Sequence, residues 1–369
     1  MKVLCVFGTR PEAIKMAPVV KAFRNHPEKF ETRVCVTAQH REMLDQVLDL
    51  FQIRPDHDLN LMRANQSLAA ITASVITQLD QVLQQEKPDW ILVQGDTTTA
   101  MAAALTGFYN RVRVGHIEAG LRTWDKAQPF PEEINRVLAG HLSDLHFAPT
   151  EQARQNLLRE GINTDHVFVT GNTVIDALLD VADRPFSWAD SALRDIPRDR
   201  KIILVTAHRR ENFGAPLQNI CEALADIAAQ RDDIHIVYPV HLNPNVREVA
   251  HRRLGNISNI TLLPPLEYLP MAHLLKTSWL VLTDSGGLQE EAPGLGKPVL
   301  VMRDVTERPE GVAAGTVKLV GTTRETIVGE VRCLLEDKST YAQMSQAVNP
   351  YGDGHASQRI VDAIARHSW

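Results

Sequence analysis

The sequence contains no segment that would carry the chain into or across a membrane. No run of residues approaches the roughly 20 consecutive apolar positions that a membrane-spanning helix needs. The apolar stretch 2–7 leads directly into a turn at Gly8, and no small-residue cleavage site of the signal-peptide kind follows it. We therefore expect a cytoplasmic protein that binds no membrane.

Paired cysteines and an excess of basic residues are also missing. The four cysteines are scattered and form no C-x-x-C pair, so we expect buried, reduced thiols at Cys5, Cys35, Cys221 and Cys333. The formal net charge of -6 argues against nucleic acid and anionic membrane surfaces as partners. This charge still permits a local basic site for a small anion.

The signatures of common cofactor, metal and nucleophile sites are absent as well. The sequence has no G-x-G-x-x-G fingerprint of a dinucleotide site and no complete P-loop. It has neither the zinc-type spacing H-E-x-x-H nor the serine-nucleophile motif G-x-S-x-G. We expect no cofactor and no metal ion, and we interpret residues 56–58 as a polar loop.

What the sequence does contain is a regular alternation of short apolar stretches and longer amphipathic ones. A length of 369 residues favours two domains. Apolar stretches that alternate with helical patterns predict α/β domains whose parallel sheets are buried on both faces. The expected strands cover 2–7, 32–37, 90–94, 112–117, 144–148, 166–169, 201–206, 234–238, 260–263, 279–283, 298–302 and 317–320. The expected helices cover 12–25, 40–50, 67–86, 97–109, 216–230, 244–254, 268–276, 287–294 and 323–336.

The alternation is interrupted once, which indicates a boundary. Residues 183–200 are polar, contain two prolines and show no clear period. We predict a Rossmann-like N-terminal domain at 1–172, a hinge at 173–200 and a Rossmann-like C-terminal domain at 201–354. A turn-rich stretch after residue 349 precedes a last helix at 356–367.

Charged residues follow the first strand, where a helix begins. Pro11 suits the first helical position because its missing N–H costs nothing there. Arg10 and Lys15 flank this helix start, and a helix N-terminus with nearby cations is a good diphosphate site. The alternative is a surface turn with two solvated cations.

Three carboxylates follow later strands of the first half, at positions where ligand groups gather in open α/β sheets. Asp96 follows the strand 90–94, and its alternative role is the N-cap of the next helix. Glu118 lies among small residues, where an apolar surround would raise its pKa for proton transfer, and its alternative is a pair with Arg122. Glu132 stands four residues before Arg136, so a plain helical ion pair is its alternative.

The second half offers groups suited to a phosphate. His208 follows a clean strand, where it could donate to a phosphate or stabilise a leaving group, although a capping turn is the simpler alternative. The stretch Ser285-Gly286-Gly287 exposes backbone N–H groups at a helix start, which is typical of a phosphate cradle. Glu291 lies about one turn later and is placed to hold ribose hydroxyls, and Arg308 adds a cation downstream.

Taken together and in this order, the motifs resemble the non-hydrolysing bacterial UDP-N-acetylglucosamine (UDP-GlcNAc) 2-epimerases over nearly the whole chain. Each motif is weak alone, and the set is specific. The motifs that carry the resemblance are Gly8-Thr9-Arg10-Pro11-Glu12, Gly95-Asp96-Thr97-Thr98-Thr99, His116-Ile117-Glu118-Ala119-Gly120-Leu121-Arg122, Pro131-Glu132-Glu133-Ile134-Asn135-Arg136, Gly171-Asn172-Thr173, His208-Arg209-Arg210-Glu211-Asn212, His241-Leu242-Asn243-Pro244 and Asp284-Ser285-Gly286-Gly287.

The resemblance implies a glycosyltransferase-B fold, in which two Rossmann-like domains face each other across a cleft and the last helix, 355–369, packs back on the first domain. It also implies a homodimer and an isomerase that interconverts UDP-GlcNAc and UDP-ManNAc without a cofactor. The acid/base candidates that it implies are Asp96, Glu118 and Glu132, with His208 near the UDP leaving group. The implied UDP and sugar contacts are Arg10, Lys15, Arg136, Ser285, Gly286, Gly287, Glu291 and Arg308.

Relatives of this kind often bind a second, activating UDP-GlcNAc. The matching positions here are Gln39, His40, Gln66, Arg209 and His241. The sequence departs from the family pattern at Gln94, where many relatives have His, and at Leu266 and Met271, where contacts to uracil are expected.

The implied reaction eliminates UDP to give 2-acetamidoglucal and then adds UDP back, supplying ManNAc for cell-surface polysaccharide. The alternatives are a UDP-sugar glycosyltransferase of the same fold, a hydrolysing epimerase that releases ManNAc, and a non-catalytic nucleotide-sugar sensor. The acidic motifs of the first half favour the epimerase over the glycosyltransferase and the sensor, and the hydrolysing epimerase stays open.

Overall fold

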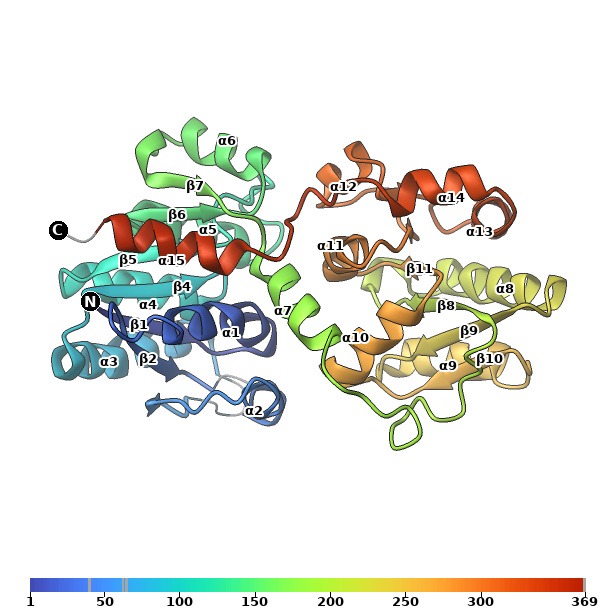
Figure 1. The fold of residues 1–369 in the computed structure, drawn as a ribbon, viewed down its shortest axis with the longest axis horizontal. Coiled ribbons are helices and arrows are strands. Elements are labelled where there is room, and N and C mark those ends of the chain that lie inside the picture. Colours follow the sequence, from blue (N-terminus) through green and yellow to red (C-terminus); the bar gives the residue numbers. More distant parts are fainter. Residues whose placement is uncertain (39–40, 62, 64–65, 368–369) are drawn as a thin grey trace. The chain divides into compact units, whose positions relative to one another are not determined.

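The computed structural model describes residues 1–38, 41–61, 63 and 66–367. The chain forms two compact units, one made of Met1–Ala177 with Tyr351–Trp369 and the other of Leu178–Pro350 (Figure 1). The helix α7 (Thr173–Ala182) contains the point where the first unit passes into the second.

Within the described residues, the first unit contains a seven-stranded parallel sheet with the order β3-β2-β1-β4-β5-β6-β7. Its strands are β1 (Lys2–Phe7), β2 (Glu31–Val36), β3 (His57–Asp58), β4 (Trp90–Gln94), β5 (Arg113–Ile117), β6 (Leu145–Ala148) and β7 (Val167–Val169). Its helices are α1 (Arg10–Arg24), α2 (Arg41–Leu50), α3 (Leu68–Glu86), α4 (Thr98–Tyr109), α5 (Glu132–Leu142), α6 (Glu151–Arg159) and α15 (Ala356–Arg366).

The second unit repeats the plan with a six-stranded parallel sheet of order β10-β9-β8-β11-β12-β13 in the described part of the chain. Its strands are β8 (Lys201–Thr206), β9 (Ile234–Pro239), β10 (Ile260–Leu263), β11 (Leu280–Thr283), β12 (Val299–Val301) and β13 (Val317–Leu319). Its helices are α8 (Ala215–Gln230), α9 (Pro244–Leu254), α10 (Tyr268–Thr277), α11 (Gly286–Gly294), α12 (Pro309–Ala313), α13 (Arg324–Glu336) and α14 (Lys338–Ser345).

The central strands of both sheets are apolar along their whole length because helices cover both sheet faces. In β1 the residues Val3–Phe7 are fully buried, and in β11 the residues Leu280–Thr283 are equally inaccessible. Side chains on both faces of such a strand leave water, which is the main driving force for forming each unit. The predicted fold class, two parallel-sheet α/β domains, is confirmed.

Every predicted strand is present, with ends within one residue of the expected bounds. Three further helices, α6, α12 and α14, were not predicted from the sequence. The interpretation of residues 56–58 as a polar loop was wrong, because His57 and Asp58 pair with β2 as the two-residue strand β3. Such a short strand shows no period. Three of the cysteines are buried and free as expected, whereas Cys333 is only partly buried.

The last helix belongs to the first unit, although it follows the whole second unit in the sequence. α15 packs against α1 (Figure 1). The carboxylate of Asp176 accepts the backbone N–H groups of Ala356 and Ser357 at 3.2 and 2.8 Å, so it satisfies donors at the start of α15 that have no partner within the helix. The backbone N–H of Asn172 also donates to the carbonyl of Tyr351 at 2.6 Å.

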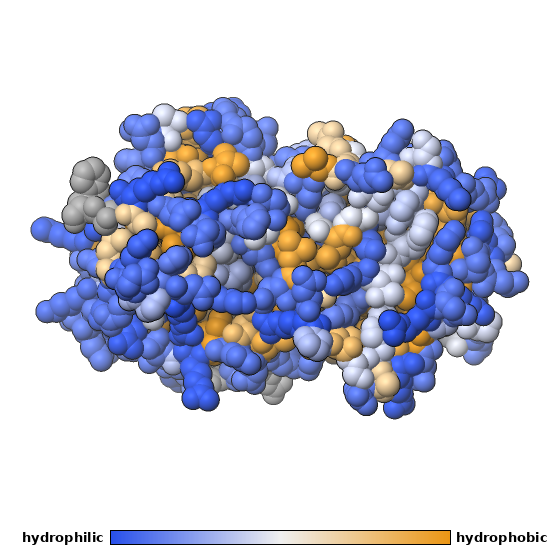
Figure 2. Space-filling view, in the orientation of Figure 1, coloured by the Kyte–Doolittle hydropathy of each residue, from blue (hydrophilic) through white to orange (hydrophobic). Residues whose placement is uncertain are grey.

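The surface drawn in Figure 2 is mainly hydrophilic, and its hydrophobic residues form separate groups between hydrophilic ones. No helix in the described residues combines the length and the apolar character needed to cross a membrane.

Two glycines have similar backbone conformations but different surroundings. Replacing each of them by alanine therefore distinguishes the effect of a steric clash from that of backbone strain. Gly120 has φ +90°, and a Cβ there would lie 2.2 Å from the carbonyl oxygen of Ala153, whereas Gly161 has φ +87° and open space. We expect Gly161→Ala to lower the unfolding free energy by about 1–2 kcal/mol, the cost of the left-handed backbone. Gly120→Ala should lower it by at least about 3 kcal/mol, because the backbone of α6 must also move.

Urea unfolding followed by circular dichroism measures both effects. Equal losses for the two variants would contradict the close approach of Gly120 to α6.

Candidate active site

The polar residues of interest lie at the carboxyl ends of the parallel strands, where βα loops place side chains beyond the sheet. In the first unit they follow β1, β4 and β5, which are neighbours in the sheet order. In the second unit they follow β8 and β11, which are also neighbours.

Asp96 lies in the loop between β4 and α4, and two residues of α5 hold it there. The guanidinium of Arg136 contacts the Asp96 carboxylate, and the side-chain amide of Asn135 donates to its backbone carbonyl at 3.0 Å. The N-cap of α4 is Thr97, whose hydroxyl accepts the N–H of Ala100. Asp96 is therefore not the helix cap, and its carboxylate remains partly exposed, with 28% of the side chain accessible.

Glu118 follows β5 and has a surround that is polar rather than apolar, contrary to expectation. Both carboxylate oxygens lie within 2.7 Å of the ammonium of Lys15, which comes from α1. The amides of Gln94 and Asn172 also donate to this carboxylate. The backbone φ of Glu118 is +62°, an uncommon value for a residue other than glycine.

The alternative pair of Glu118 with Arg122 is not what the structure contains. Arg122 forms two hydrogen bonds of 2.7 Å with the carboxylate of Glu160, and its side chain is fully buried. The cation that Glu118 contacts is therefore Lys15 from α1.

Glu12 is a residue that the search for site carboxylates missed. It is almost fully buried, and its carboxylate accepts the backbone N–H groups of Gly8 and Thr9 at 3.0 and 2.7 Å. It also accepts the hydroxyl of Thr97 at 2.6 Å. Burial raises the pKa of Glu12, and these hydrogen bonds oppose the rise.

The spacing Thr9-x-x-Glu12 is that of a capping box, a signal that was readable in the sequence. Its consequence is that a protein carboxylate already occupies two of the N–H groups leading into α1. Arg10 is the first residue of this helix and is only partly buried.

Arg136 does more than form a helical pair. Besides Asp96, it contacts Glu133 at 3.3 Å, so it joins α5 to the loop after β4. Glu133 is buried and accepts the N–H groups of Thr123 and Trp124. Glu132 begins α5 and is partly buried.

A neutral histidine forms a hydrogen bond with the loop that contains Asp96. His116 in β5 is inaccessible, and its Nε2 lies 2.7 Å from the carbonyl oxygen of Gly95. Since a carbonyl only accepts, this nitrogen carries the proton, and Nδ1 has no partner in the described residues. Burial lowers the pKa of His116 to about 3.

In the second unit, the loop after β8 approaches the N-terminus of α11. Ser285 is the N-cap residue of α11, and Gly287 is exposed. A Cβ on Gly286 would lie 3.6 Å from the guanidinium of Arg209, so a cation stands beside the free N–H groups of this helix. Helix dipole, exposed backbone donors and a cation together suit an anion such as a phosphate.

The two other predicted UDP contacts of this unit already have protein partners. Glu291 accepts the hydroxyl of Tyr268 at 3.1 Å, and Arg308 contacts Glu290, which is buried. Glu291 lies on α11, and Arg308 is the residue directly before α12.

The positions matched to an activating ligand are divided between the units. His241 stacks on His208 with ring centroids 5.6 Å apart, and Arg209 is the next residue in the same loop. Gln66 lies in the first unit and accepts the N–H of Arg63 at 2.9 Å. Gln39 and His40 lie outside the described residues.

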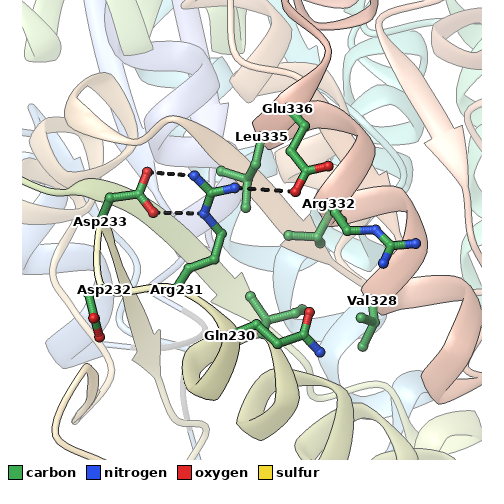
Figure 3. A pocket seen from close by; sticks show the side chains of 10 residues that line it. Gln230, Arg231, Asp232, Asp233, Val328, Arg332, Leu335 and Glu336 are labelled. Carbon is green, nitrogen blue, oxygen red and sulfur yellow. Dashed lines mark hydrogen bonds and ion pairs between the residues drawn. The ribbon is translucent and has the colours of Figure 1, made fainter.

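A cavity of about 420 Å³ lies elsewhere in the second unit (Figure 3). Arg231, which bonds to Asp233 and Glu336, lines it between the end of α8 and the end of α13. Because β9 begins directly after Asp233, this cavity lies at the amino ends of the strands. The N-terminus of α11 lies at the other end of the strands, where their carboxyl ends are. Within the described residues, no group of three or more His, Cys, Asp or Glu side chains is arranged to hold a metal ion.

The chain is similar to known epimerases over nearly its whole length. A family model described as UDP-N-acetylglucosamine 2-epimerase matches residues 21–365. The UDP-N-acetylglucosamine 2-epimerase of Escherichia coli O157:H7 is 59% identical, and the alignment covers 99% of this chain and 98% of that protein.

Solved structures agree with this likeness. The Neisseria meningitidis UDP-GlcNAc 2-epimerase bound to UDP-GlcNAc has a TM-score of 0.88 and 51% identity, with 100% of both chains covered. The Methanocaldococcus jannaschii enzyme in complex with UDP-GlcNAc and UDP has a TM-score of 0.80 and 34% identity, covering 99% of this chain and 100% of that one. The glycosyltransferase-B-like fold is thereby confirmed.

The buried histidine predicts a pH dependence of stability. Unfolding exposes His116, which then takes up a proton below about pH 6.5, whereas the folded protein excludes that proton down to about pH 3. The unfolded state binds more protons in this window, so stability rises with pH there, by at most about 1.4 kcal/mol per pH unit for this group. His116→Gln keeps a donor for Gly95 and cannot titrate, so it should flatten the slope.

Urea unfolding at a series of pH values measures this slope. His26→Gln, at a site where a third of the side chain is accessible, is the matched control and should leave the slope unchanged. An unaltered slope in His116→Gln would contradict a neutral, buried imidazole.

Proposed function

This chain belongs to the UDP-N-acetylglucosamine 2-epimerase family, and we propose that it interconverts UDP-GlcNAc and UDP-ManNAc without releasing free sugar. The observation that carries the proposal is the charge arrangement at the strand ends. The first unit presents Asp96 and Glu118, each beside a cation, and the second presents His208 and Arg209 beside the N-terminus of α11.

The proposed chemistry uses the leaving group at C1. The C2–H bond of the sugar is not next to a carbonyl, so simple deprotonation is difficult. A base takes the C2 proton, the C2–H electron pair forms the C1=C2 bond, and the C1–O pair leaves with UDP to give 2-acetamidoglucal. Protonation of C2 from the opposite face and return of UDP to C1 give UDP-ManNAc. The protein's task is to move a proton and to hold the diphosphate.

The carboxylates Asp96, Glu118 and Glu132 are proposed to exchange the C2 proton. Glu118 is suited to exchange a proton with the sugar, because Lys15 and two amides fix its carboxylate in position. Asp96 is partly exposed, and Arg136 orients its carboxylate.

The diphosphate is proposed to bind at the N-terminus of α11, beside Ser285, Gly286 and Gly287. The backbone N–H of Ser285 already donates to the hydroxyl of Thr283 at 2.9 Å, so the two glycines are proposed to supply the backbone donors. Arg10, Lys15, Arg136, Glu291 and Arg308 are the further proposed contacts to UDP and the sugar. The Neisseria meningitidis relative is bound to UDP-GlcNAc, which supports the same ligand here. His208 is proposed to face the leaving diphosphate.

A second, activating UDP-GlcNAc is proposed to contact Gln39, His40, Gln66, Arg209 and His241. We also propose that the enzyme works in the cytoplasm and supplies ManNAc for cell-surface polysaccharide.

We further propose a homodimer. Phe108 and Tyr109 at the end of α4 expose 60% and 64% of their surface, and Ile134 and Leu138 are exposed on α5, a helix that packs against α4. Large exposed apolar groups of this kind are typical of association surfaces. Light scattering should give twice the chain mass of 41.1 kDa. Phe108→Asp should shift the mass to that of one chain, and a wild-type monomer would refute the dimer.

The reaction itself is tested by incubating UDP-GlcNAc with the enzyme in heavy water, with nothing added. We expect UDP-ManNAc to appear and deuterium to enter C2 in both nucleotide sugars. Free ManNAc with UDP would indicate a hydrolysing enzyme, and a requirement for an acceptor sugar would indicate a glycosyltransferase. Binding of UDP without deuterium uptake would indicate a non-catalytic nucleotide-sugar sensor.

The acid/base roles are tested by isosteric variants. Asp96→Asn, Glu118→Gln and Glu132→Gln should each lower kcat by about 100-fold or more, because each removes a group that transfers a proton. Glu151→Gln, at an exposed carboxylate on α6, is the matched control and should retain the wild-type rate. Normal deuterium exchange in one of the three variants would remove that residue from the mechanism.

A further inference from the structure

One carboxylate of the second unit is completely buried and has no part in the mechanism described so far. Asp284 follows β11 and has no accessible surface. One of its oxygens, Oδ2, accepts the backbone N–H groups of His208 and Arg209, both at 2.8 Å, and the side-chain amide of Asn212 at 3.0 Å. These three donors belong to the loop after β8, so Asp284 holds that loop against the neighbouring strand β11 (Figure 1).

The other oxygen of Asp284 is in a different situation. Oδ1 is buried and has no hydrogen-bond partner among the described residues. It lies 3.3 Å from Nδ1 of His208. A buried carboxylate oxygen without a donor is costly. The distance to Nδ1 already suits a hydrogen bond, so a modest rotation of the imidazole that aligns an N–H on Nδ1 with Oδ1 would supply the missing donor. The geometry of this pair is therefore that of a histidine oriented by a carboxylate.

We propose that Asp284 is a positioning residue that holds the proton of His208 on Nδ1 and directs Nε2 toward the diphosphate of the substrate. The proposal rests on the role of His208 at the leaving group. Asp284 itself does not touch the substrate.

The chemistry follows from what each atom can do. An ionised carboxylate only accepts, so the ring nitrogen facing it must carry a proton. Nε2 then accepts when the ring is neutral and donates when the ring is protonated. As the C1–O bond breaks, negative charge grows on the departing diphosphate oxygen. A protonated Nε2 donates a hydrogen bond to that oxygen, and the nearby carboxylate stabilises the imidazolium.

Other charged groups act on His208 as well. Burial lowers the pKa of His208, and so do the neighbouring His241 and Arg209, whereas Asp284 acts in the opposite direction. Glu307 offsets part of the charge of Arg209, at 3.4 Å. Among the described residues that act on the charge of His208, Asp284 is thus the group that favours a second proton on the ring.

The variant Asp284→Asn separates positioning from folding. The amide oxygen still accepts the three donors of the loop, so the backbone should stay in place. The amide nitrogen now presents a donor to Nδ1, which forces the neutral ring to carry its proton on Nε2. Nε2 would then no longer be an acceptor in the neutral ring, and the ring would be harder to protonate.

Nuclear magnetic resonance of protein labelled with ¹⁵N-histidine reads both properties directly in the free enzyme, and His208→Gln identifies the signals. In the wild type we expect the Nδ1–H form in the neutral ring. In Asp284→Asn we expect the Nε2–H form and a lower pKa of His208, with a proton affinity reduced about tenfold or more. Asp337→Asn is the control, because Asp337 also accepts two backbone N–H groups in this unit, and it should change neither property.

Kinetics with UDP-GlcNAc supply the second reading. Asp284→Asn should lower kcat by about 100-fold, with KM changed by less than about threefold, because the interaction strengthens as charge develops. The limb of the kcat–pH profile that belongs to His208 should move to lower pH. The double variant Asp284→Asn with His208→Gln should be no slower than His208→Gln alone.

Different results would contradict the positioning role of Asp284 and the proposed epimerase function. A wild-type spectrum with the neutral proton on Nε2, or a pKa of His208 that Asp284→Asn leaves unchanged, would overturn the role of Asp284 whatever the kinetics. A wild-type enzyme that makes no UDP-ManNAc would instead overturn the proposed function, while the spectra still decide how Asp284 acts on His208. Because the wild-type spectrum alone tests the tautomer, the test survives even if the variant does not fold.

Discussion

Each unit depends on one buried carboxylate that ties the loop after its first strand to the loop after a neighbouring strand. In the first unit Glu12 accepts two N–H groups of the loop after β1 and the hydroxyl of Thr97 after β4. In the second unit Asp284, which follows β11, accepts two N–H groups of the loop after β8. The strand pairs β1–β4 and β8–β11 are adjacent in their sheets. The parallel arrangement therefore brings each pair of loops together at one edge, where a single carboxylate can join the two loops.

This arrangement also decides which backbone donors are left for a ligand. The N–H groups leading into α1 are already used by Glu12, so cationic side chains are the main groups that this helix start offers to a phosphate. At α11 the Ser285 side chain makes no cap, and Gly287 is exposed. The helix N-terminus of the second unit is thus the better anion site, which agrees with assigning the diphosphate to it.

Opposite charges surround the carboxylates of the first unit before any ligand binds. Lys15 lies against Glu118, and Arg136 lies against Asp96. A pair that is mostly buried costs desolvation energy, and fixed partners with correct geometry offset that cost. The result is a set of carboxylates whose orientation is fixed by protein contacts, an arrangement that catalysis by preorganised charges requires.

The sequence alone was enough to predict the alternating strands and helices, the two sheets and the family, because periodicity and short motifs are local properties of the chain. It did not reveal β3 or α12, which are too short to show a period. Nor did it reveal that Lys15 pairs with Glu118, 103 residues away, or that Asp284 reaches the loop of His208, 76 residues away. Those contacts depend on which strands lie side by side, and strand order is set by the packing of the whole sheet. The tertiary structure therefore decided the partners, the burial and the ionisation of the same residues that the sequence had already singled out.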